Sequence, residues 1–292
     1  MHSLSWQCRD RVLDCAVPRI MGILNVTPDS FSDGGRYFDP ARAVARALAM
    51  EAQGADIIDI GGESTRPGAT PVPADEEIRR TAPVIRALRE RMECLISVDT
   101  TKAVVARAAL DAGAHIINDI TAGADPAMAT AVRESGAGWV LMHMQGAPPT
   151  MQQDPRYAGA ATEIAAFLRE RVAAFVRAGV ALEQLVLDPG LGFGKKTEHN
   201  LELLCHIPDL AALGRPVVIG ASRKSFLGKI TGCADPAERL AASLAALCFA
   251  RQQGAQIFRV HDVQESRAAL QVLAATSGTH DGGDAGRLAF WR

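Results

Sequence analysis

The chain has 292 residues, of which 48% are hydrophobic and 22% charged, and its formal net charge is −2. This composition is typical of a globular protein and excludes an intrinsically disordered chain. The near-zero charge also removes the usual electrostatic argument for binding nucleic acid or an anionic membrane surface.

The first segment, residues 3–17, predicts a small hairpin, because two short runs at 4–7 and 12–15 flank Arg9 and Asp10. No secretory signal is visible before Pro18, and the six cysteines show no metal-like spacing, so we expect reduced thiols in a cytoplasmic protein. Cys8 and Cys15 could face each other in the hairpin, although a disulfide is the less favoured interpretation. The longest uncharged stretch, residues 135–153, contains Gly, Pro and Gln and predicts no membrane span.

From residue 20 onward, eight short apolar runs recur along the chain, each followed by a turn and an Ala-rich stretch. These runs predict strands over residues 20–24, 56–60, 94–98, 115–120, 139–143, 185–187, 217–220 and 256–260. Most contain few charges, as expected of strands that are buried on both faces of a parallel sheet.

The stretches between them predict helices over residues 40–53, 75–91, 102–112, 126–134, 160–177, 199–207, 236–253 and 263–275. Several follow an Asp-Pro pair, at Asp39, Asp125 and Asp235, and several end at Gly54, Gly113 and Gly179. Eight alternating units favour an α/β fold of the (β/α)8 TIM-barrel type over an open sheet. We therefore expect a hairpin extension (1–18), one barrel domain (19–275) and a flexible tail (276–292).

Polar residues follow every predicted strand, at the end where such barrels carry their active sites. They are Asn25, the segment 61–68, Asp99, Asn118 and Asp119, His143, Asp188, the segment 222–225, and Arg259 with His261 and Asp262. Helix capping alone could explain an isolated Asp99, Asp119 or Asp262. It does not explain eight polar strand ends together, so the pattern predicts a site.

Two loops at this end have the composition of segments that close over a ligand: residues 25–35, and the segment from Gly61 through Pro71. Ordinary surface loops are the alternative interpretation. Ser225 begins a predicted short helix over residues 226–230, and its free amides beside Lys224 favour an anion site.

Two of these segments resemble the signatures of the dihydropteroate synthase family. MGILNVTPDSFSDGG at 21–35 is similar to the first signature, and GGESTRPG at 61–68 to the second. Shorter matching segments follow in family order at 97–100, 117–119, 142–146, 188–195, 222–228 and 259–263. The resemblance implies a usually dimeric barrel that joins 4-aminobenzoate to (7,8-dihydropterin-6-yl)methyl diphosphate by SN1-like loss of diphosphate. It also implies a Mg²⁺ ion on the diphosphate and inhibition by sulfonamides.

The resemblance also implies roles for individual residues. The catalytic set is Asn25, Asp99, Lys224, Arg259 and His261. The pterin contacts are Asp99, Asn118, Met142, Asp188 and Lys224. The diphosphate contacts are Asn25, Thr65, Arg66, Arg259 and His261, with Asn25 also the Mg²⁺ ligand. The aminobenzoate contacts are Phe31, Thr65, Arg66, Pro67, Phe193, Lys224 and Ser225. Asp33 belongs to the loop of residues 25–35, which closes over the pterin cation.

These residue types suit the chemistry. An ionised Asp188 can accept from the pterin N3–H and 2-amino group together, and Asn118 can donate and accept along the same edge. We expect His115 and His143 to be core histidines and Lys195 and Lys196 to be a solvated pair. A methyltetrahydrofolate-dependent methyltransferase module and a catalytically silent pterin-binding paralogue are the alternative functions.

Overall fold

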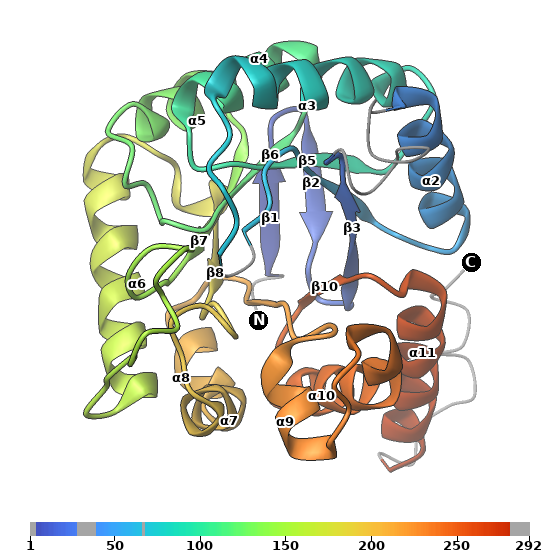
Figure 1. Cartoon of the computed structure of the whole chain (residues 1–292), viewed down its shortest axis with the longest axis vertical. Helices are drawn as coiled ribbons and strands as arrows, with labels where there is room; N and C mark the ends of the chain where they lie inside the picture. Colours follow the sequence, from blue (N-terminus) through green and yellow to red (C-terminus); the bar gives the residue numbers. More distant parts are fainter. Residues whose placement is uncertain (1–3, 28–38, 66–67, 281–292) are drawn as a thin grey trace.

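The computed structural model describes residues 4–27, 39–65 and 68–280. In these ranges, eight parallel strands form a barrel with helices around it, and a separate antiparallel hairpin lies at one end (Figure 1). The predicted (β/α)8 barrel with an N-terminal hairpin is therefore confirmed.

All eight predicted barrel strands are present. The hairpin pairs β1 (Ser5–Cys8) with β2 (Arg11–Asp14). The barrel strands are β3 (Arg19–Asn25), β4 (Ile57–Gly61), β5 (Leu95–Asp99), β6 (Ile116–Asp119), β7 (Gly138–Met142), β8 (Leu185–Asp188), β9 (Val218–Ile219) and β10 (Ile257–Val260). Their order is β8-β7-β6-β5-β4-β3-β10-β9, and a parallel bridge between Leu187 and Val217 links the two ends of the sheet.

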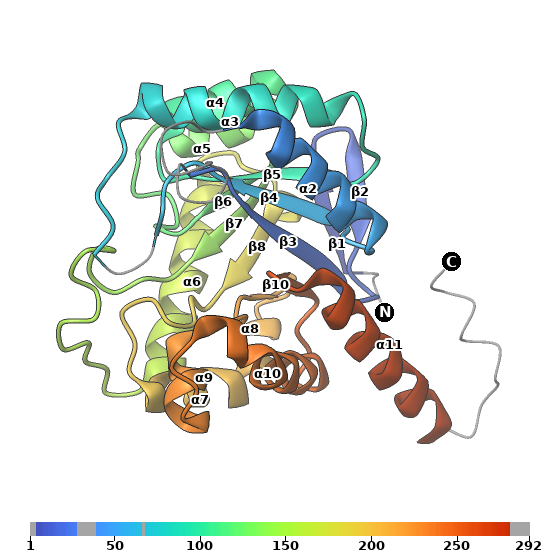
Figure 2. The same cartoon turned by 45° about the vertical axis from the view of Figure 1, so that its right-hand side comes forward.

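Helices of the described ranges surround the barrel. They are α2 (Pro40–Ala52), α3 (Ala74–Arg89), α4 (Ala103–Ala112), α5 (Met128–Ser135), α6 (Ala160–Arg177), α7 (Thr197–Cys205), α8 (Ile207–Ala211), α9 (Ser225–Thr231), α10 (Leu240–Gln252) and α11 (Val263–His280), with 3-10 turns η1 (Leu182–Gln184) and η2 (Pro236–Arg239). The helix predicted over 199–207 is thus divided at His206, and Pro208 lies in the first turn of α8. Helix α11 continues beyond its predicted end at residue 275 and projects from the barrel (Figure 2).

Asp39 caps α2 as predicted, whereas the turns at Asp125 and Asp235 precede later helix starts: α5 begins at Met128 and, after η2, α10 begins at Leu240. Asp39, Asp125 and Asp235 each accept a hydrogen bond from the backbone N–H two residues later, at 2.9, 3.0 and 2.9 Å. Gly113 ends α4 with φ of 113°, a left-handed conformation that a side chain would strain.

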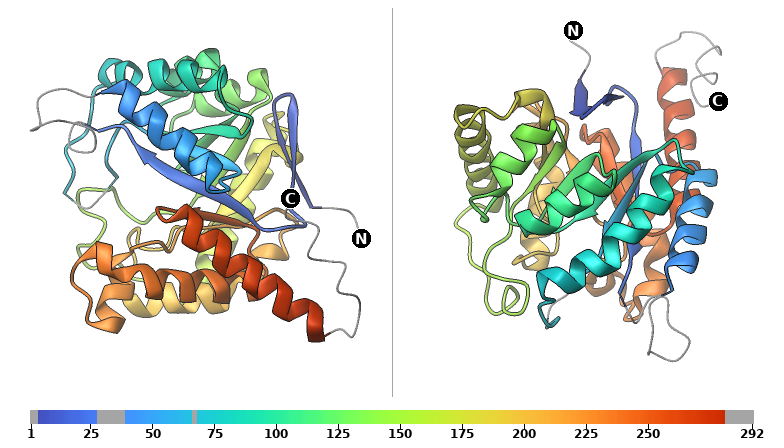
Figure 3. Two further views of the ribbon diagram at one scale, coloured as in Figure 1. Left: turned by 90° about the vertical axis from the view of Figure 1, so that its right-hand side faces the viewer. Right: turned by 90° about the horizontal axis from the view of Figure 1, so that it is seen from above.

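The floor of the barrel is apolar and is closed by the hairpin. Each barrel strand contributes one buried residue to a layer that comprises Met21, Ile57, Leu95, Ile116, Val140, Val186, Val218 and Ile257. Trp6, Cys8 and Cys15 pack against this layer, and Trp6 Nε1 donates to the Gln184 carbonyl at 2.8 Å. The hairpin therefore covers the end at which the strands begin (Figure 3).

Cys8 and Cys15 are both buried free thiols. Burial raises the pKa of Cys15 to about 12 and that of Cys8 well above its ordinary value. These thiols pack as small apolar groups. Within the described residues, no helix has the length and apolar composition needed to cross a membrane.

Candidate active site

The interior of the barrel changes from apolar to polar within one layer of side chains. Alternate residues of a strand face the same side, so positions two residues beyond the floor layer also point inward. These positions include Asp59, Ser97, Asn118, Met142, Asp188 and Arg259. All except Arg259 are buried, and together they form a polar layer over an apolar floor.

Asp59 lies at the centre of this polar layer, and the sequence analysis missed it. Its carboxylate accepts from Ser97 Oγ at 2.6 Å, from Asn118 Nδ2 at 2.9 Å and from Arg259 Nε at 2.6 Å. Counting two residues from the floor position Ile57 would have located Asp59, because Ile57 and Asp59 lie on one strand.

Arg259 joins two carboxylates across the barrel. Its Nη2 donates to Asp99 Oδ2 at 2.7 Å, while its Nε donates to Asp59. Burial raises the pKa of Asp99 to about 7; Arg259 opposes this rise and the neighbouring Asp59 adds to it. The two carboxylates in turn raise the pKa of Arg259, so the guanidinium stays charged.

Asp188 and Lys224 lie on the other side of the same opening. Asp188 Oδ1 accepts from the Gly190 N–H at 2.7 Å, and burial raises the pKa of this carboxyl group. Lys224 Nζ lies 4.1 Å from the centre of the Phe193 ring, a cation–π contact. Burial and the nearby Arg259 lower the pKa of Lys224 to about 8.

His261 is held by Ser222. The Ser222 hydroxyl lies 3.0 Å from His261 Nδ1, and burial lowers the pKa of this imidazole to about 3, so the ring is neutral. Next to Ser222, Arg223 has a left-handed backbone with φ of 58°. Its guanidinium forms two hydrogen bonds with Asp262, which ties the loop before α9 to the start of α11. Asp262 is therefore an ion-pair partner of Arg223.

Three further predicted residues, Asn25, Thr65 and Ser225, lie at the same end of the barrel. Asn25 ends β3 beside Gly61, and a Cβ on that glycine would lie 3.8 Å from Asn25 Oδ1 and 3.6 Å from Asp99 Cβ. Thr65 is half-buried in the loop after β4, and Ser225 is exposed as the first residue of α9. The predicted residues Phe31, Asp33, Arg66 and Pro67 lie outside the described residues.

Lys195 corrects one expectation from the sequence. It is buried, whereas Lys196 is exposed and pairs with Asp154 at 3.3 Å, so the two lysines are not a solvated pair. Lys195 Nζ donates to the Phe193 carbonyl at 2.8 Å and to the His143 carbonyl at 3.2 Å. Burial lowers its pKa to about 7. Lys195 therefore joins the loops that follow β7 and β8.

The two predicted core histidines flank neighbouring strands: His115 directly precedes β6, and His143 directly follows β7. His115 is buried, and its Nδ1 accepts from the Ile96 N–H at 3.1 Å. His143 is half-buried against the rings of Tyr157 and Phe167, with its Nδ1 3.1 Å from Lys195 Nζ.

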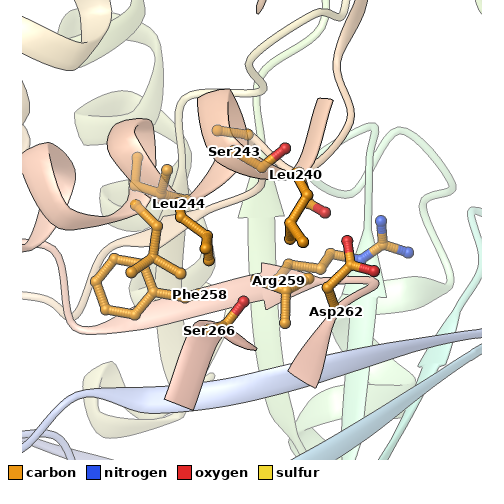
Figure 4. Close-up of a pocket in the computed structure, with 12 residues that line it drawn as sticks. Leu240, Ser243, Leu244, Phe258, Arg259, Asp262 and Ser266 are labelled. Carbon is orange, nitrogen blue, oxygen red and sulfur yellow. The ribbon is translucent and has the colours of Figure 1, made fainter. Parts of the chain in front are cut away.

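A pocket lies behind the site, between the barrel wall and helices α10 and α11 (Figure 4). Its lining is mostly apolar and includes Leu240, Leu244, Phe258, Ser243 and Ser266. It reaches Ser222, Arg259 and Asp262 but none of the other polar residues of the barrel opening. The polar layer, and not this pocket, is therefore the candidate active site.

The polar barrel opening agrees with what this chain is similar to. Residues 21–261 match the family model described as pterin binding enzyme. The dihydropteroate synthase of Escherichia coli (strain K12) is 48% identical over 264 residues, which is 90% of this chain and 93% of that protein.

Two solved structures extend the comparison. Xanthomonas albilineans dihydropteroate synthase with 4-aminobenzoic acid is 47% identical, with a TM-score of 0.89 over 94% of this chain and 98% of that one. The same enzyme in complex with 7,8-dihydropteroate is 44% identical, with a TM-score of 0.86 over 94% and 98% of the two chains. The fold and site thus define a pterin-binding barrel enzyme. Within that class, the chain belongs to the dihydropteroate synthase family.

Proposed function

We propose that the chain condenses 4-aminobenzoate with (7,8-dihydropterin-6-yl)methyl diphosphate to give 7,8-dihydropteroate and diphosphate, a transferase step of folate biosynthesis. The observation that carries this proposal is the group of polar side chains at the barrel opening, in a chain of this family: Asp99, Asn118, Asp188, Lys224 and Arg259. The C–O bond between the pterin methylene and diphosphate breaks, a C–N bond forms to the amine, and the amine proton passes to solvent.

The pterin is held by the deeper polar residues. Asp188 accepts from N3–H and the 2-amino group, and Lys224 donates to the 4-oxo oxygen, so the ring edge is matched at several points. Met142, which is 3% exposed, packs against the ring. Such a buried polar site distinguishes the pterin from its analogues, because an analogue that lacks one hydrogen-bonding group leaves a buried protein group unpaired.

The leaving diphosphate is bound by Arg259, His261, Thr65 and Arg66. The pterin ring nitrogens can delocalise positive charge at the methylene, which favours an SN1-like order in which diphosphate leaves first. Asp99 stabilises the pterin cation in its ionised form, and the closed apolar floor keeps water out from below.

The donor set fits a Mg²⁺ ion that arrives with the substrate. Asn25 ends β3 with its Oδ1 beside Gly61, and it is a neutral oxygen of the kind that Mg²⁺ accepts. No three His, Cys, Asp or Glu side chains among the described residues are grouped to hold a metal by themselves. When bound, the ion neutralises charge on the diphosphate.

The second substrate lies nearer the surface. Phe193 and the Lys224 stem flank the aminobenzoate ring, and Ser225 with the start of α9 takes its carboxylate. The family resemblance assigns Phe31 and Pro67, which lie outside the described residues, to the same ring. Sulfonamides mimic this substrate, and we expect them to compete with it. We further infer a cytoplasmic homodimer that acts on these small molecules and binds neither nucleic acid nor membrane.

Diphosphate release with both substrates and Mg²⁺ tests the proposal. We expect turnover that requires 4-aminobenzoate and is inhibited competitively by a sulfonamide. Tight pterin binding without turnover would instead support the silent paralogue, and methyl transfer from methyltetrahydrofolate would support the methyltransferase module.

A further inference from the structure

Asp59 is a buried charge that no substrate contact accounts for. It lies in the middle of β4 with an exposed fraction of 0%, and its carboxylate faces the barrel interior. Ser97 on β5, Asn118 on β6 and Arg259 on β10 all donate to it. One carboxylate therefore connects four strands, and two of its three partners belong to the proposed substrate site.

The contact with Asn118 fixes the direction of an amide. An ionised carboxylate only accepts hydrogen bonds, so the nitrogen of Asn118 has to face Asp59, at 2.9 Å. The Asn118 oxygen then points away from Asp59 as an acceptor. Asp59 thus determines which way the Asn118 amide faces, and therefore which of its atoms a pterin edge would meet.

The contact with Arg259 fixes a guanidinium. Asp59 accepts from its Nε at 2.6 Å and Asp99 accepts from its Nη2 at 2.7 Å. Because both anchors are carboxylates on neighbouring strands, they restrict the orientation of the planar guanidinium. Among the described residues, no hydrogen bond engages its Nη1 group, which can therefore donate to a ligand.

We propose that Asp59 is a positioning residue of the reaction: it orients Asn118 toward the pterin and Arg259 toward the leaving group. This inference rests on the proposed function.

The charge of Asp59 also acts on Asp99, which is surrounded by several other charged groups. Arg259 and Lys224 provide the positive charges, and Asp59, Glu77 and Asp119 provide the negative ones. Burial raises the pKa of Asp99 to about 7, and Asp59 is the first of the carboxylates that add to the rise. Removal of the Asp59 charge should therefore lower the pKa of Asp99.

The test is Asp59→Asn, which keeps the size of the side chain and removes its charge. We expect KM for the pterin diphosphate to rise about tenfold or more, because an amide cannot accept from all three donors. We also expect the acid limb of the kcat/KM profile to move about one pH unit lower, since Asp99 loses a negative neighbour.

Ser97→Ala is the matched control. It removes one of the three hydrogen bonds to Asp59 and leaves the charge, so the acid limb should stay where it is in the unsubstituted chain. A purely structural role for Asp59 would give Asp59→Asn and Ser97→Ala the same unshifted profile, and that result would overturn the inference.

The remaining outcomes are also decisive. If Asp59→Asn does not fold, Asp59→Ser removes the charge with a smaller side chain and is measured in the same way. Loss of the fold in both variants would overturn the inference, because Asp59 would then be a residue of the core alone. Absence of turnover in the unsubstituted chain contradicts the proposed function instead, and calorimetric pterin binding to Asp59→Asn then still reports on the orientation of Asn118.

Discussion

Lys195 shows how the surroundings of one side chain can change its chemistry. Burial lowers the pKa of Lys195 to about 7 and that of His143 beside it to about 3. A neutral amine can donate to the Phe193 and His143 carbonyls and accept from His143 Nδ1, so all three contacts survive deprotonation.

This depressed pKa predicts a pH-dependent stability. Between pH 7 and the ordinary lysine value, the unfolded chain binds more protons at this position than the folded chain, so stability rises with pH. Relative to Lys195→Met, the unsubstituted chain should therefore gain up to about 1.4 kcal/mol of unfolding free energy per pH unit in this window. Urea unfolding of both chains at several pH values measures this difference in unfolding free energy.

Lys196→Met is the control for this experiment. The Lys196 side chain is 44% exposed, so Lys196→Met removes a neighbouring lysine without removing a buried charge, and the steep rise should be confined to the Lys195→Met comparison. Parallel pH curves for Lys195→Met and the unsubstituted chain would contradict the burial of a costly charge at Lys195.

At the scale of elements, the connection after β6 depends on a glycine that lies under two rings. Gly123 has φ of +76°, and a Cβ there would lie 2.4 Å from Phe175 Cζ and 2.9 Å from Trp139 Cη2. These two rings, from α6 and β7, have centroids 4.3 Å apart. The glycine thus lets the loop pass beneath a packed aromatic pair.

Gly123→Ala should lower the unfolding free energy by about 3 kcal/mol or more, because it adds a steric overlap to an unfavourable backbone conformation. Gly214→Ala separates the two effects: φ is +75° there and no atom lies within 4 Å, so we expect a loss of only about 1 kcal/mol. Equal losses in urea unfolding would show that the rings move aside freely.

The elements themselves were predictable from the sequence because their signals are local. Asp-Pro starts, glycine ends and apolar runs depend on a few neighbouring residues, and eight units determine a barrel. The loop that contains Lys195 was not predictable in this way, since a Lys-Lys pair is usually solvated and only the carbonyls of Phe193 and His143 draw Lys195 inward.

The centre of the site was only partly predictable. Asp188, Lys224 and Arg259 follow from family signatures at strand ends, whereas Asp59 lies inside a run interpreted as a buried strand. Its main partner, Arg259, is 200 residues away in sequence. No local pattern contains that contact, although the two-residue spacing from the floor layer would have pointed to it.

For the molecule as a whole, the hairpin is part of the folded core. Trp6 is fully buried beneath the barrel, and Arg215 also reaches the hairpin, with its Nη2 donating to the Ser5 carbonyl at 3.0 Å. Trp6→Ala should therefore lower the unfolding free energy by about 3–5 kcal/mol in one cooperative transition.

Val12→Ala, on the same hairpin but 63% exposed, should change stability by less than about 0.5 kcal/mol. The urea midpoints of the two variants measure the contrast. A small effect of Trp6→Ala would mean that the hairpin unfolds separately from the barrel.

The sealed floor also determines the route of ligands. Among the described residues, Trp6 and the eight apolar residues close the floor, so substrates and products have to pass through the polar end of the barrel. The pterin contacts Asn118 and Asp188 lie deepest, whereas Ser225 lies at the exposed rim. On the proposed function, the pterin therefore has to enter before aminobenzoate, and the rim ligand controls when the deeper one can depart.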